Sequence, residues 1–201
     1  LLEALEAEGR RKEAVLEARR SWVEDDYTKS DEDYVLGLYG SHLGSADHAR
    51  RLDRLLWDGR IDAARRLLPM VEADRRAVAA ARIALQTSAP GVDQALARVP
   101  AARRGDPGLA YDRVHWRRLK GMDAEAQAIL LDPPAELVRP DLWWDERSIQ
   151  ARRALAAKDY RTAYRLAARH GVSEGPDLAE AEWLAGWLAL RFERNPAAAL
   201  G

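Results

Sequence analysis

The stretch HARRLDRLLWDGRIDAARRLL, residues 48–68, decides the fold because it reads as two helices joined by a very short turn. Apolar residues from Ala49 to Leu56 recur at three- and four-residue steps, which lays one apolar stripe along a helix. The turn Asp58-Gly59-Arg60 contains a glycine suited to ending that helix. Two helices joined so closely must run antiparallel, so the stretch predicts a helical hairpin.

The same order, a turn followed by an alanine-rich helix start, returns along the chain. Small residues at such places let one helix approach the next closely, as in solenoid proteins. The intervals are too uneven for a regular tetratricopeptide array with its period of about 34 residues. We therefore expect an all-α fold, an irregular α-superhelix of stacked antiparallel helical hairpins. The further turns are Glu8-Gly9-Arg10 before Ala14, Lys120-Gly121-Met122 before Ala124 and Ala126, Lys158-Asp159-Tyr160 before Ala163, and Arg194-Asn195-Pro196 before Ala197 to Ala199.

The remaining helix breakers are short joints. Ser88-Ala89-Pro90-Gly91 and Gly105-Asp106-Pro107-Gly108 are neither long enough nor biased enough to be interdomain linkers. We therefore expect a single domain over residues 1–201. The chain begins at Leu1 in what reads as the middle of a helix, without an initiator methionine or signal-peptide pattern, so we expect a fragment of a longer protein.

Composition excludes several classes of protein. Lys+Arg 32 against Asp+Glu 33 gives a net charge of -1, so no basic field exists to attract nucleic acid. The absence of cysteine excludes disulfides and thiolate metal sites. The longest apolar run, Trp183 to Leu190, is far shorter than the roughly 20 residues that span a bilayer. We expect neither a nucleic-acid partner nor a membrane span.

No catalytic or cofactor motif is present. The histidines are dispersed, and no two have the spacing of a helical metal site. Acidic runs such as Asp31-Glu32-Asp33 and Asp145-Glu146 are interpreted as solvated faces or helix-start charges. There is no phosphate-binding loop, dinucleotide fingerprint or nucleophile elbow. The sequence predicts no catalytic residue, no cofactor and no metal.

Tryptophan dominates the aromatic residues, with seven Trp against one Phe. Trp143 and Trp144 point about 100° apart on a helix, which is typical of a helix sandwiched between neighbours. A stacking platform for sugars or bases is the alternative, and packing is favoured. Trp183 and Trp187 lie four residues apart with Gly186 between them, where glycine allows a close helix crossing, so we expect this pair in the core.

Arginines embedded in apolar windows are the most informative charges. Such a side chain either forms an ion pair between helices or faces the concave side of a superhelix, and we favour pairing. The arginines are Arg82, Arg113, Arg117, Arg147 and Arg152, and the candidate partners are Asp53, Asp112, Asp145 and Glu180.

From about Trp22 onward, a succession of Trp- and Arg-containing blocks resembles the α-helical superhelical region of the bacterial soluble lytic transglycosylases. Both the order and the approximate intervals match. The blocks are His48 to Trp57, Ala81 to Leu85, Gly108 to Arg113 with Trp116 to Arg118, Trp143 to Arg147, and Glu182 to Leu190; their motif positions, in the packing or on the inner wall, are His48, Arg51, Asp53, Trp57, Arg82, Tyr111, Arg113, Trp116, Arg117, Trp143, Trp144, Arg147, Glu182, Gly186 and Trp187.

The resemblance implies a peptidoglycan-directed protein in the periplasm of a Gram-negative bacterium. In that family a stack of helices curls into a U or ring, and a C-terminal lysozyme-like domain cleaves the β-1,4 bond between N-acetylmuramic acid and N-acetylglucosamine, leaving a 1,6-anhydro sugar. The family's catalytic signature, Glu-Ser followed by a Gly-Leu-Met-Gln block, is absent from these 201 residues. The resemblance thus implies a non-catalytic scaffold whose partners are glycan strands and its own catalytic domain.

Two other functions stay open. A tetratricopeptide-like solenoid that binds a peptide would explain the hairpins equally well, but not the Trp-Arg blocks. A free-standing helical hydrolase would require two carboxyl groups held across a cleft at roughly 5 to 10 Å, and nothing local specifies that pair.

Overall fold

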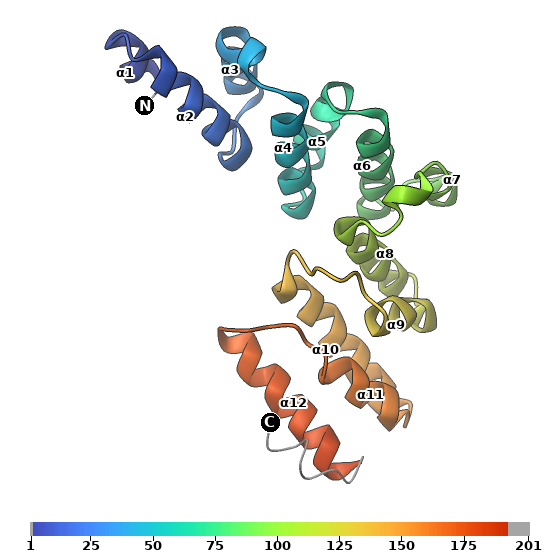
Figure 1. Cartoon of the computed structure of the whole chain (residues 1–201). Helices are drawn as coiled ribbons and strands as arrows, with labels where there is room; N and C mark the ends of the chain where they lie inside the picture. Colours follow the sequence, from blue (N-terminus) through green and yellow to red (C-terminus); the bar gives the residue numbers. More distant parts are fainter. Residues whose placement is uncertain (1, 193–201) are drawn as a thin grey trace. The chain divides into compact units, whose positions relative to one another are not determined.

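The computed structural model describes residues 2–192, and all regular structure within them is helical (Figure 1). This confirms the predicted all-α fold. By its internal contacts the chain divides into two compact units, Leu1–Arg104 and Gly105–Gly201. The single domain and the superhelix therefore stay predictions, and each unit has its own apolar core.

The first unit contains seven α-helices within the described residues. Short 3-10 turns follow three of them, at Gly40–His42, Leu68–Met70 and Ala101–Arg103. Its core joins side chains from Leu5 to Ile83, which include the fully buried Trp22. The helices are α1 (Leu2–Ala7), α2 (Arg11–Glu24), α3 (Lys29–Tyr39), α4 (Ser45–Trp57), α5 (Ile61–Leu67), α6 (Ala73–Gln86) and α7 (Val92–Ala97).

The second unit contains five α-helices within the described residues. In its core Trp143 and Trp144 pack among small and aliphatic side chains from Ala110 to Leu188. Helix α12 packs against both α10 and α11 (Figure 1). The helices are α8 (Pro107–Leu119), α9 (Asp123–Leu131), α10 (Pro140–Ala156), α11 (Tyr160–Ala167) and α12 (Pro176–Arg191).

Four helix pairs in the described residues share one turn, in which the second helix begins two residues after a left-handed residue. Helix α6 ends with the same hydrogen bond, from Ala89 to Ala84 after the left-handed Ser88, but α7 begins only four residues after Ser88. The first helix of each pair is followed by a residue in the left-handed region, and the next N–H donates to the carbonyl five residues back, as Arg60 does to Leu55 at 2.8 Å. This bond satisfies a carbonyl that the helix end leaves without a partner. Glycine adopts the conformation without steric cost, whereas a side chain is strained there. The left-handed residues are Gly9 (φ +71°), Gly59 (φ +66°), Gly121 (φ +72°) and Lys158 (φ +65°).

A buried alanine follows each of these turns by five residues. The methyl group lies where the second helix begins to pack against its neighbours, and each alanine has 0% exposure. A larger side chain at this position would have to push the helices apart. The alanines are Ala14, Ala64, Ala126 and Ala163. The fifth predicted turn, Arg194-Asn195-Pro196, lies outside the described residues.

We expect Ala126→Leu to destabilise the protein by about 1–3 kcal/mol, because its added carbon atoms have no free space. Ala124→Leu is the matched control: Ala124 is exposed on the same helix, so its effect should stay within about 0.5 kcal/mol. Urea unfolding of the two variants measures the difference. Equal losses would show that the alanine after the turn does not limit how closely the helices pack.

Candidate functional site

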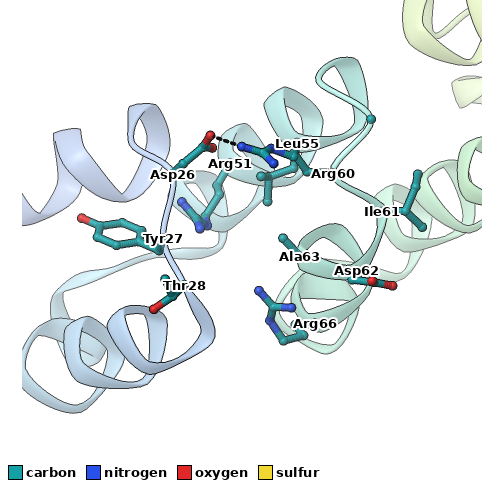
Figure 2. A pocket seen from close by; sticks show the side chains of 11 residues that line it. Asp26, Tyr27, Thr28, Arg51, Leu55, Arg60, Ile61, Asp62, Ala63 and Arg66 are labelled. Atoms are coloured by element: carbon teal, nitrogen blue, oxygen red, sulfur yellow. Dashed lines mark hydrogen bonds and ion pairs between the residues drawn. The ribbon is translucent and has the colours of Figure 1, made fainter.

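A pocket of about 580 Å³ lies in the first unit, between the loop after α2, helix α4 and the start of α5. Figure 2 shows the side chains of Arg51 and Arg66 directed toward this space, with Tyr27 and Thr28 on the side of the loop. Arg60, in the left-handed turn between α4 and α5, also lines the pocket. Three arginines therefore surround one open space.

Arg51 holds the wall of the pocket together. Its guanidinium is fully buried and donates through Nη1 to the carbonyl oxygens of Trp22, at 2.7 Å, and Asp25, at 3.0 Å. Its carbon Cζ also lies 4.5 Å from the ring centroid of Trp22 and 5.0 Å from that of Tyr27. Burial lowers the pKa of Arg51, and Glu32 opposes that shift. Arg51 of α4 thus binds carbonyl groups at the end of α2 and in the loop that follows, and so fixes both against α4.

Glu32 on α3 supplies the negative charge that this buried cation requires. Its carboxylate accepts from Arg51 Nη2 at 3.0 Å and from Arg66 Nε at 2.5 Å, and only 4% of the residue is exposed. The hydrogen bond that Arg66 donates to Glu32 raises the pKa of Arg66. Three helices, α3, α4 and α5, therefore meet at one carboxylate.

The rim of the pocket carries a weaker pair. Arg60 Nη2 donates to Asp26 at 2.6 Å, and both side chains are more than half exposed (Figure 2). Hydrogen bonds from Arg60 and Arg54 lower the pKa of Asp26, so this carboxylate stays ionised. Water competes with an exposed ion pair and weakens it. Among the arginines of this pocket, Arg60 can therefore exchange its carboxylate partner most easily.

The other predicted residues of the first unit lie in helix packing. His48 is buried edge-on against Trp22, with ring centroids 5.6 Å apart, and burial lowers its pKa. Arg82 is 1% exposed, donates to Asp53 at 2.8 Å and lies over the ring of Trp57 at 4.9 Å. The pair Arg82–Asp53 joins α6 to α4, which agrees with the expected ion pairing between helices.

In the second unit a buried carboxylate binds α10 to α8. Glu146 is 2% exposed, lies 2.7 Å from His115 Nδ1 and accepts from Arg118 Nε at 2.6 Å. Burial would raise the pKa of Glu146, but the hydrogen bonds from His115 and Arg118 outweigh it and lower the pKa. A carboxyl group held ionised in this way cannot serve as a general acid near neutral pH. Tyr111 stacks on His115, and burial raises its pKa.

The tryptophan pair of α10 is buried. Trp143 has 0% and Trp144 1% exposure, and the indole nitrogen of Trp144 donates to Glu180 at 3.3 Å. These positions agree with the packing interpretation. Arg147 is equally buried; its Nη1 contacts the Leu166 carbonyl at 3.5 Å, and burial lowers its pKa to about 10, so it remains charged at neutral pH.

The remaining predicted residues do not meet in one site. Arg113 and Trp116 are half-buried on α8, and burial lowers the pKa of Arg113. Arg117 donates to the backbone carbonyl of Glu125 at 3.1 Å. Glu182 lies 3.2 Å from His170, and Gly186 is half-buried.

Two interpretations of the sequence need correction. Asp31 and Glu32 lie in the first turn of α3, as helix-start charges do, but Glu32 is buried there rather than solvated. Glu146 is also buried rather than on a solvated face, and both carboxylates accept from arginines on neighbouring helices. Trp183 and Trp187, expected in the core, are 63% and 37% exposed, because α12 turns its other side toward the core of the unit. The partners of Glu32 and Glu146 are 19 or more residues away, and no local pattern indicates them.

Neither family models, curated proteins nor solved structures give a significant match to this chain. The resemblance to the soluble lytic transglycosylases therefore stays a prediction. No helix in residues 2–192 has the length and apolar character needed to cross a membrane. In the same range no three His, Asp or Glu side chains are placed to hold a metal ion.

We expect Arg51→Ala to cost about 3–5 kcal/mol of stability, because it removes one partner of a buried ion pair. The adjacent Arg50→Ala is the control, since Arg50 is exposed and its partner Asp47, although buried, keeps the hydrogen bond from the backbone N–H of Gly44 and the ion pair with Arg19; its cost should stay below about 1 kcal/mol. Urea unfolding compares the two. Similar midpoints would contradict the clamping role of Arg51.

Glu146→Gln should destabilise the protein by about 1–3 kcal/mol at pH 7. Because the folded pKa of Glu146 lies below its ordinary value of 4.5, its stabilisation is present above that value and is lost as pH falls through the folded pKa. The difference between variant and unchanged chain should therefore shrink between pH 7 and pH 3. Urea unfolding at both pH values measures it, and a constant difference would contradict an ionised Glu146.

Proposed function

We propose that this chain is the non-catalytic helical scaffold of a soluble lytic transglycosylase, which positions peptidoglycan and the catalytic domain for cleavage to 1,6-anhydro products in the periplasm. Its hairpins form an irregular α-superhelix in this proposal. The parent protein is the enzyme, and the catalytic residue belongs to a lysozyme-like domain outside these 201 residues.

Two features support a scaffold. The same turn and buried alanine occur in four hairpins of the described residues. Stacking of similar helical hairpins is how helical repeat proteins form extended surfaces. Three arginines in the blocks that carry the resemblance are used for packing: Arg51, Arg82 and Arg147 have at most 1% exposure. Such buried residues hold the helices together, and the exposed side chains remain available for binding.

The observation that carries the proposal is the exposed Arg60 at the rim of the pocket. Peptidoglycan stem peptides carry carboxylates, and arginine recognises this group through paired N–H donors. A stem carboxylate could replace Asp26 on Arg60 without breaking the buried contacts of Arg51 and Arg66. The pocket then supplies space for the adjoining peptide.

Co-sedimentation with purified sacculi tests this contact. We expect Arg60→Glu to weaken binding about three- to tenfold, and the effect to diminish as salt screens the charge. Arg20→Glu is the control with the same charge change, since Arg20 is similarly exposed on α2 but lies outside the pocket. Equal weakening by both variants would contradict the pocket as the binding place, and absence of binding at low salt would overturn the peptidoglycan contact.

Product analysis tests the non-catalytic role separately. Sacculi incubated with the chain should release no anhydro-muropeptides. Their release would show that the chain itself carries the activity.

A further inference from the structure

Helix α12 has two apolar sides. One side carries Ala181, Leu184 and Leu188 into the core of the second unit. The other side presents Trp183, Trp187 and Leu190, with exposures of 63%, 37% and 60%. We refer to these three residues as the outer face of α12. The rings of Trp183 and Trp187 lie parallel, at an interplanar angle of 6° with centroids 6.1 Å apart, and Phe192 lies edge-on against Trp187 with ring centroids 5.4 Å apart.

The outer face occupies positions that are packed in the other hairpins. Three other hairpins with the shared turn allow a comparison. In each of them we consider the three residues of the first helix that stand 11, 7 and 4 positions before the left-handed residue of the turn. Eight of these nine residues are buried, and the ninth, Arg117, is half-buried. They are His48, Leu52 and Leu55 on α4; Ala110, Val114 and Arg117 on α8; and Arg147, Ala151 and Ala154 on α10.

If Arg194 is taken as the turn residue, Trp183, Trp187 and Leu190 stand at the same three positions. The sequence that follows matches the other turns. Asn195 corresponds to Asp159, the N-cap of α11, and proline is favoured at the first helical position that Pro196 would take. Ala199 then stands five residues after the turn residue, as Ala163 does after Lys158. Residues 193–201 lie outside the described part of the chain, so this correspondence rests on sequence.

We propose that the outer face of α12 is the docking surface for the next helix of this same chain, which the sequence predicts to start at Pro196. Ala199 is the residue of this segment that corresponds in sequence to the buried Ala163. Two indole rings and a leucine side chain become buried, which gives the docking an apolar driving force. This proposal does not rest on the proposed function, because it concerns packing within the chain.

Fluorine NMR of the 201-residue chain labelled with 5-fluorotryptophan tests the docking. Trp183→Phe and Trp187→Phe assign the two signals, and the change of each signal between H₂O and D₂O reports the exposure of its ring. In the unchanged chain we expect both changes to be well below that of free fluorotryptophan. Ala199→Glu should raise both toward the free value, because a carboxylate cannot be buried against the two rings without a partner.

Ala197→Glu is the matched control. The equivalent residues in the other four hairpins, Lys12, Asp62, Ala124 and Arg161, are all exposed, so this variant should leave both signals unchanged. Rings that are as exposed in the unchanged chain as in Ala199→Glu would overturn the proposal, and so would an equal effect of Ala197→Glu. Protection that rises with protein concentration would also overturn it, because a second copy would then cover the face.

Discussion

The left-handed turn followed by a buried alanine is the constraint on which the hairpins depend. The turn reverses the chain within a few residues, and the hydrogen bond to the carbonyl five residues back is the same in all four hairpins in the described residues in which an alanine follows. The alanine then sets how closely the second helix approaches, because any larger side chain would occupy the space of its neighbours. Loops as short as these leave the helix pairs little choice of arrangement.

Buried arginine–carboxylate contacts connect the hairpins to neighbouring helices. Arg51 with Glu32 joins α4 to the preceding helix α3, and Arg118 with Glu146 joins α8 to α10, which are separated in the chain by α9. Taking a charge out of water is costly unless an opposite charge and hydrogen bonds replace the water. These contacts therefore favour one arrangement of the helices within each unit over alternatives in which the charges would be unpaired.

Burial separates the arginines and tryptophans that pack from those that are available to bind. Most arginines in the Trp-Arg blocks are occupied by packing, so the arginine available for a ligand is an exposed one, Arg60, which no block singled out. The tryptophans divide similarly: Trp143 and Trp144 are covered within their unit, whereas Trp183 and Trp187 are left on its outer face. Residue type alone does not separate packing from binding here, because exposure differs among identical side chains.

The sequence by itself determined the helices and the turns, because these depend on interactions between residues at most five positions apart. It indicated alanine-rich helix starts, but packing against neighbouring helices decided which alanine is buried: Ala126 is covered and Ala124 is exposed. It also indicated that arginines in apolar windows would pair across helices, as Arg82 does with Asp53. Only the tertiary structure decided that Glu32 and Glu146 are buried, that Arg60 faces a pocket, and that one side of α12 is uncovered. Those properties depend on partners 19 to 36 residues away, and on which helix face has a neighbour; local sequence contains neither.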